Sequence, residues 1–180
     1  MTYLDIIKSV KKPLLILPIL GIAMVGVYFL STQSAPTLHT PSQADTGHIK
    51  INDKSILTVF IPTTITSSNA GLAVFDKFYD DYAMLFRTPP DIEPALWMKD
   101  MKFDIDMVWL DSDDRIAFIN HQVSHLDQET VYQAPEQSSA KCVIELNAGA
   151  SHRLKLKLGD KLKFTDRSES LCQNGLWPEN

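Results

Sequence analysis

Residues 13–30 form an apolar run of 18 residues without a single charged side chain, and this run constrains the chain more than any other feature. As an α-helix rising about 1.5 Å per residue, the run would be roughly 27 Å long, close to the hydrocarbon thickness of a bilayer. Pro13 and Pro18 fall in its first turns, where a helix tolerates proline best. Because soluble helices are rarely apolar on all sides, the run predicts one transmembrane helix.

The charges around this run indicate which way it crosses the membrane. Lys8, Lys11 and Lys12 lie just before it, whereas the first charged residue after it is Asp45. By the positive-inside rule, residues 1–12 stay in the cytoplasm as a basic tip and the rest of the chain is exported. We therefore expect a single-pass protein of the cell membrane whose body is extracytoplasmic, either periplasmic or extracellular.

The run could instead be a signal that is removed after export. A cleavable signal has a shorter apolar stretch, of about 7–15 residues, followed by an Ala-x-Ala-like site. The best candidate site ends at Ala35, but Gln33 occupies the position two residues earlier and Pro36 follows directly. A retained anchor is therefore favoured, with a cleaved signal and a buried soluble helix as the alternatives.

Beyond the run the composition changes twice. Residues 31–47 are mainly small, polar or proline, which predicts a flexible linker because they cannot form an apolar core. Residues 48–166 hold short apolar segments, many alternating with a period of two, separated by turn residues. We expect a compact β-sandwich or barrel there, with one or two short helices, and a tail at residues 167–180.

The distribution of charge limits the partners of this body. The whole chain has a net charge of -5, yet residues 1–30 carry +2, so the remaining residues carry -7. A protein that binds DNA or RNA needs a cationic face to neutralise phosphates. Nucleic acid is therefore not expected as a partner; the membrane, an envelope protein or a small polar ligand fits this charge better.

Six short blocks in the body carry a family resemblance. In order and spacing they resemble the domain-of-unknown-function 192 family; the blocks are 71–74 (Gly-Leu-Ala-Val), 83–86 (Ala-Met-Leu-Phe), 96–99 (Leu-Trp-Met-Lys), 104–111 (Asp-Ile-Asp-Met-Val-Trp-Leu-Asp), 142–149 (Cys-Val-Ile-Glu-Leu-Asn-Ala-Gly) and 159–160 (Gly-Asp). The resemblance implies a compact, mostly β domain, often exported behind a signal or anchor. It implies no established activity.

The chain departs from the family pattern at three places. Ala83 replaces a glycine before Met-Leu-Phe, and Asn147 replaces a proline before Ala-Gly. Asp100 and Met101 stand where the family pattern has Asn-Thr after the lysine. If that pair contributes polar side chains to a site in the family, the site in this chain is altered.

Four residues are the candidates for a ligand site: Trp97, Lys99, Asp104 and Glu145. Trp97 and Lys99 are two apart, so an extended strand places them on one face. Glu145 lies in an otherwise apolar strand, where a carboxylate needs a partner or a solvent-facing position. These residues could line a cleft and bind a polar ligand. Alternatively, Lys99 pairs with one carboxylate while Trp97 fills the core.

The first interpretation is a non-enzymatic binding or envelope-associated module, with no cofactor and no metal expected, although the sequence leaves an enzyme open. The glycine-rich and serine-centred motifs of nucleotide binding and nucleophilic catalysis are missing. His121 and His125 are four apart on what reads as a strand running into a loop, where that spacing does not bring ligands together. The alternative is a hydrolase that uses Asp104 and Glu145 as acid and base, with Lys99 as an electrostatic helper.

The sequence contains two cysteines, Cys142 and Cys172. An even number of cysteines in an exported domain favours a disulfide, which here would tie the tail to the strand that contains Cys142. The alternative is a buried Cys142 and a free Cys172.

Overall fold

The computed structural model describes residues 44–51, 55–89 and 91–172. The predicted basic tip at 1–12, the predicted anchor at 13–30 and nearly all of the predicted linker therefore lie outside the described residues. Among the residues that are described, no helix combines the length and the apolar character needed to cross a membrane.

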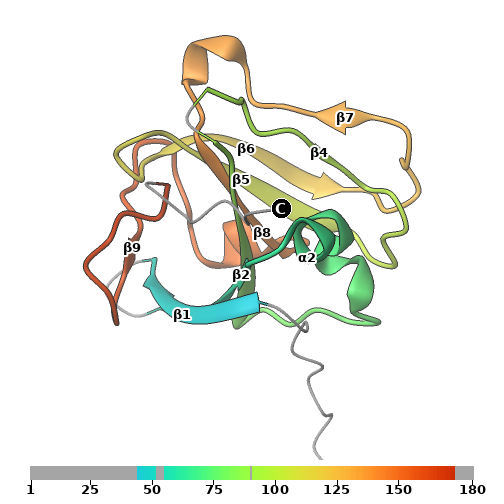
Figure 1. Cartoon of the computed structure of the whole chain (residues 1–180), viewed down its shortest axis with the longest axis horizontal. Helices are drawn as coiled ribbons and strands as arrows, with labels where there is room; N and C mark the ends of the chain where they lie inside the picture. Colours follow the sequence, from blue (N-terminus) through green and yellow to red (C-terminus); the bar gives the residue numbers. More distant parts are fainter. Residues whose placement is uncertain (1–43, 52–54, 90, 173–180) are drawn as a thin grey trace, which may run out of the picture. The chain divides into compact units, whose positions relative to one another are not determined.

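One seven-stranded sheet dominates the fold, in the order β6-β5-β8-β3-β2-β1-β9. All its neighbouring strands are antiparallel except β2 and β3, which are parallel. The strands are β1 (Ala44–Lys50), β2 (Ile56–Pro62), β3 (Tyr82–Arg87), β5 (Ile105–Leu110), β6 (Ile116–Val123), β8 (Cys142–Asn147) and β9 (Lys163–Phe164). The sheet curls into a half-barrel (Figure 1), so the prediction of a mainly β fold is confirmed.

Shorter elements surround this sheet. Strands β4 (Leu96–Trp97) and β7 (Val131–Tyr132) form a separate two-stranded ribbon, drawn at the top of Figure 1. The helical elements in the described part are α2 (Ile65–Ala70), η3 (Gly71–Val74), η4 (Glu136–Ser138) and α3 (Ala150–Arg153). Helix α2 begins at Thr64, whose side chain accepts a hydrogen bond from the Ser67 backbone N–H and so satisfies one of the first amide groups.

The two faces of the sheet follow the period-two pattern of the sequence. Every second residue on the central strands faces one continuous apolar core, which includes Leu57, Val59, Ile61, Leu85, Val108, Leu110, Ile144 and Leu146. The residues between them face the opposite side. There Phe60, Met84, Phe86, Met107 and Trp109 are also buried, because other segments cover this second face.

The two ends of the curled sheet are linked by a short contact. Arg115, just before β6, pairs in an isolated antiparallel bridge with Lys161, just before β9. The Ile116 N–H donates to the Asp160 carbonyl at 2.9 Å, and the Gly159 N–H donates to the Ile116 carbonyl at 2.8 Å. This contact joins the strands at opposite ends of the sheet order without closing a full barrel.

The folded domain is longer at both ends than the predicted range of 48–166. Strand β1 already starts at Ala44, inside the predicted linker, because it pairs with β2 along its whole length. At the other end, Leu171 is fully buried in the core, and its carbonyl accepts a hydrogen bond from Arg87 at 2.8 Å. The first residues of the predicted tail are therefore part of the domain.

A disulfide joins Cys142 of β8 to Cys172, with an S–S distance of 2.01 Å and a Cα–Cα distance of 5.2 Å. The bond closes a loop with a sequence separation of 30 residues. In the chain-entropy model such a loop stabilises the folded state by about 3–4 kcal/mol. It also fixes the segment that carries Leu171 against β8, an interior strand of the sheet.

Candidate functional site

A pocket of about 400 Å³ opens on the second face of the sheet. Helical residues of α2 and η3 form one side, the segment that includes β4 forms another, and β7 contributes one residue. The lining residues are Ser68, Asn69, Ala70, Gly71, Leu72, Phe86, Arg87, Thr88, Ile92, Glu93, Pro94, Ala95, Leu96, Trp97, Lys99, Met101, Val131 and Glu145. Three of the four predicted site residues are among them.

Glu145 is the buried acid of this pocket. It lies in β8 directly between Met84 of β3 and Met107 of β5, and only 4% of it is exposed. Its Oε2 atom has no hydrogen-bond partner in the described part of the chain. Burial raises the pKa of Glu145 to about 8, because an ionised carboxylate would lose its hydration there. At neutral pH this residue is therefore mainly a neutral carboxylic acid.

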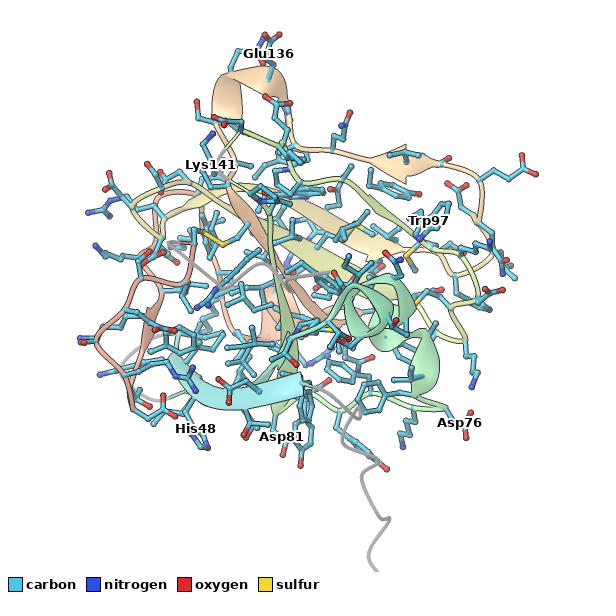
Figure 2. All side chains as sticks on the ribbon, viewed as in Figure 1. His48, Asp76, Asp81, Trp97, Glu136 and Lys141 are labelled. Atoms are coloured by element: carbon cyan, nitrogen blue, oxygen red, sulfur yellow. A yellow bond between two sulfur atoms is a disulfide. The ribbon has the colours of Figure 1, made fainter. Side chains whose placement is uncertain are left out.

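Trp97 and Lys99 form one edge of the pocket mouth. Trp97, labelled in Figure 2, is 52% exposed, and Val131, directly opposite it in the β4–β7 pair, is 59% exposed. The Lys99 Nζ atom lies 5.2 Å from the centre of the Trp97 ring, within the range of a cation–π contact. Met98 between them is fully buried, so the alternation expected from their spacing is present.

The charged groups around the pocket differ in how they are paired. Arg87 donates to the Leu171 carbonyl and forms an ion pair with Glu169 at 3.1 Å, which offsets its charge. Lys99 forms no ion pair with any of the described residues, and the pKa of Glu145 is raised by burial without an effect of Lys99. Glu93 is an exposed carboxylate of the lining. The pocket thus has one cation at its mouth beside a tryptophan and one acid in its interior.

The rest of the wall is largely apolar. Leu72 and Met101 are buried lining residues, and Met101 stands where the family pattern has a threonine. Gly71 has a φ of +48°, and a Cβ atom added there would lie 3.4 Å from the Phe86 ring. A larger residue at position 71 would therefore be strained in its backbone and close to Phe86.

Asp104, the fourth predicted site residue, does not line this pocket. Its Oδ1 atom accepts a hydrogen bond from the His125 backbone N–H at 2.8 Å and lies 2.6 Å from the His125 Nδ1 atom. These hydrogen bonds lower the pKa of Asp104. Asp104 therefore links the start of β5 to the loop after β6, and the structure does not bring the two predicted carboxylates together.

Asp106 is a buried carboxylate that the sequence analysis did not single out. It accepts hydrogen bonds from the backbone N–H groups of Gln122, Gly149 and Ser151, and from the Ser151 hydroxyl at 2.6 Å. Burial by itself raises the pKa of Asp106, but these hydrogen bonds outweigh burial and lower it. Its only sequence signal is an acid inside an apolar strand, the same signal that pointed to Glu145.

A serine and a histidine continue from Asp106 toward the surface. The His121 Nδ1 atom lies 2.8 Å from the Ser151 Oγ atom, and the His121 ring stacks on His152 at 4.5 Å. The serine stands between the acid and the histidine and is fully buried, unlike the order of a catalytic triad. Within the described residues, no group of three or more His, Cys, Asp and Glu side chains is placed to hold a metal ion.

Comparison with known proteins places this fold among related domains. A chain from Sinorhizobium meliloti 1021, described as a "putative transcription regulator", matches with a TM-score of 0.60 and 25% identity, over 68% of this chain and 95% of the other. A protein of unknown function from Novosphingobium aromaticivorans DSM 12444 matches with a TM-score of 0.62 and 22% identity, over 73% of this chain and 94% of the other. None of the curated proteins compared with the chain matches it.

The model of one protein family matches the chain over residues 47–164, which is more than half of its length. This range starts in β1 and ends at the last residue of β9. It contains the pocket, Glu145 and all six sequence blocks described above. The chain therefore belongs to the domain-of-unknown-function 192 family, which is described as "Uncharacterized ACR".

Proposed function

We propose that this chain is a membrane-anchored, extracytoplasmic binding module that holds a small molecule in the pocket beside Trp97. The observation that carries the binding role is the buried carboxyl of Glu145, which lines an open pocket and whose Oε2 atom has no hydrogen-bond partner in the part of the chain that the structure describes. A buried polar group without a partner costs free energy, so its retention suggests that a ligand satisfies it.

The lining indicates a ligand that is largely apolar, in contrast to the small polar ligand expected from sequence. Leu72, Phe86, Met101 and Val131 line the pocket together with the Trp97 ring. Exposed apolar side chains at a pocket mouth, such as Trp97 and Val131, are typical of sites that bind ligands or partners. An envelope protein is the alternative partner for this surface.

The hydrolase alternative is less well supported than binding. Acid–base catalysis needs two groups within reach of one substrate, but Asp104 lies outside the pocket lining and is engaged by His125. A role in transcription, suggested by the description of the Sinorhizobium protein, is also not favoured. The net charge of -5 offers little to bind nucleic acid.

Binding can be tested by ¹⁹F NMR of the full chain labelled with 5-fluorotryptophan. The sequence has three tryptophans, and the Trp97 resonance is assigned with a Trp97→Phe variant. In a screen of small aromatic and aliphatic compounds, we expect some to shift the Trp97 resonance in a saturable way. The buried Trp109 serves as the internal reference. A screen in which no compound shifts Trp97 would count against a small-molecule site.

The proposed location rests on the apolar run 13–30, on the charges before it and on the disulfide, which is typical of oxidising compartments. We expect protease added to bacterial spheroplasts to digest the domain while a cytoplasmic marker stays intact. We also expect Cys142 and Cys172 to resist alkylation until a reductant is added. Protection from the protease, or reduced cysteines in the cell, would contradict an extracytoplasmic body.

A further inference from the structure

The neighbours of Glu145 explain why its Oε2 atom has no hydrogen-bond partner among the described residues. On both adjacent strands the residue directly paired with it is a methionine, Met84 on β3 and Met107 on β5. A thioether sulfur is at best a weak hydrogen-bond acceptor and has no proton to donate. The two strand neighbours of Glu145 therefore cannot satisfy the acid, whereas the pocket that Glu145 lines can hold a group that does.

The charge state of Glu145 determines what kind of group it can bind. A neutral carboxylic acid donates one strong hydrogen bond through its O–H group. Burial favours this neutral form, and among the described residues no cationic side chain counteracts the effect of burial. An ammonium group on a ligand would require the ionised form, and the desolvation of such a buried pair often exceeds its Coulomb attraction. An oxygen acceptor fits the neutral acid better than an amine does.

The mouth of the pocket also favours an uncharged ligand group over a cationic one. Lys99 lies over the Trp97 ring and already occupies one ring face, where a ligand cation would otherwise bind. A second positive charge there would be repelled by the Lys99 ammonium group. Glu93 in the lining would favour a cation, but it is exposed, so solvent screens its charge.

We propose that the pocket takes a small, largely apolar molecule that carries an uncharged carbonyl oxygen, and that the protonated Glu145 carboxyl donates a hydrogen bond to this oxygen. The apolar part of the ligand would contact Leu72, Phe86 and Met101, with the Trp97 ring at the mouth. This inference rests on the proposed function, because it names the ligand chemistry of the same site.

Two matched probes test the inference: 4-phenylbutan-2-one and 4-phenylbutan-2-amine, which share one apolar skeleton and differ in the oxygen or ammonium group. Each is titrated into the full chain, with the Trp97 ¹⁹F resonance as the readout. All variants are kept in the same detergent, so that partitioning of the probe affects them equally. At pH 6.5 we expect the ketone to bind at least about ten-fold more tightly than the amine, the value of one hydrogen bond.

Two variants separate the hydrogen bond from the shape of the pocket. Glu145→Gln keeps a donor of similar size that does not ionise, so we expect ketone affinity within about three-fold of the original and unchanged between pH 6.5 and 9.5. The unaltered chain should lose about ten-fold over the same range, as Glu145 ionises. Glu145→Leu removes the donor and should bind the ketone about ten-fold less tightly at pH 6.5. Near-ultraviolet circular dichroism checks folding at each pH.

The outcomes distinguish this inference from the proposed function. Tighter binding of the amine would overturn the inference while leaving the pocket a binding site. So would a ketone affinity that neither Glu145→Leu nor a rise to pH 9.5 lowers from that of the unaltered chain at pH 6.5. If neither probe binds but other compounds shift Trp97 in the screen, the inference is again overturned. If no compound in the screen binds either, both the inference and the proposed function fail.

Discussion

Replacing Asp106 by alanine is expected to lower the free energy of unfolding by about 4 kcal/mol or more. The substitution removes the acceptor of four hydrogen bonds, from the backbone N–H groups of Gln122, Gly149 and Ser151 and from the Ser151 hydroxyl. Each buried donor left without a partner costs about 1–3 kcal/mol. Because a domain of this size is stable by only about 5–15 kcal/mol, little stability would be left. Urea unfolding followed by circular dichroism measures the change.

Asp106→Asn is the matched control for this prediction. It keeps the oxygen that accepts from Gln122 and Gly149 but places an amide where Ser151 donates, so an intermediate loss of about 2 kcal/mol is expected. The lowered pKa of Asp106 adds a pH dependence. Its stabilising contribution is present above the pKa of the unfolded state and is lost as the pH falls through the lower pKa of the folded state. A loss of unfolding free energy below about 1 kcal/mol for Asp106→Ala would show that β5, β6 and the start of α3 hold together without the Asp106 carboxylate.

The period-two pattern and the isolated acid were the sequence features that best predicted the fold and the residues that line the pocket. The alternation of Leu57, Val59 and Ile61 predicted which side of β2 faces the core. Trp97 and Lys99 lie together at the pocket mouth as expected, although β4 ends at Trp97 and Lys99 lies in the turn after it. Glu145 could be singled out because a strand rarely retains an acid among apolar neighbours without a reason. These signals depend only on residues that are close together in the sequence, so they can be identified without a structure.

Contacts between residues that are far apart in the sequence could not be predicted in the same way. Asp104 forms its hydrogen bonds with His125, which is 21 residues away and lies in the loop after β6. The segments 68–72 and 92–97 meet only because β3 crosses the sheet between them. A local pattern contains no information on which of several distant polar groups will be neighbours, so Asp104 looked equivalent to Glu145 in sequence.

The domain ends were missed for a related reason. Residues 44–47 and 167–172 look polar and loop-like in isolation, yet they stabilise each other. Arg167 forms an ion pair with Asp45 at 2.8 Å and donates to the Thr46 carbonyl at 2.7 Å. The order of both segments therefore comes from a contact across more than a hundred positions of sequence, assisted by the disulfide at Cys172.

Glu145 should make the domain less stable as the pH rises from about 4.5 to about 8. In the unfolded chain the carboxyl loses its proton near 4.5, the ordinary pKa of a glutamate, whereas the folded domain retains the proton up to a pKa of about 8. Between these values the unfolded state binds fewer protons, so stability falls with pH, by at most about 1.4 kcal/mol per pH unit. Below this range the penalty is absent, and above it the penalty is constant.

The contribution of Glu145 is isolated by comparing the full chain with Glu145→Gln in urea at a series of pH values. The glutamine does not ionise, so the stability of the unaltered chain relative to this variant should fall between pH 4.5 and 8 by several kcal/mol and then stay level. Effects of Asp106 and other carboxyls are common to both proteins and cancel. Parallel pH curves for the two proteins would mean that Glu145 ionises normally in the folded state. Ionisation of Glu145 destabilises the fold, whereas the proposed ligand would bind the protonated form and stabilise it. The pH dependence of stability is therefore expected to change when the pocket is occupied.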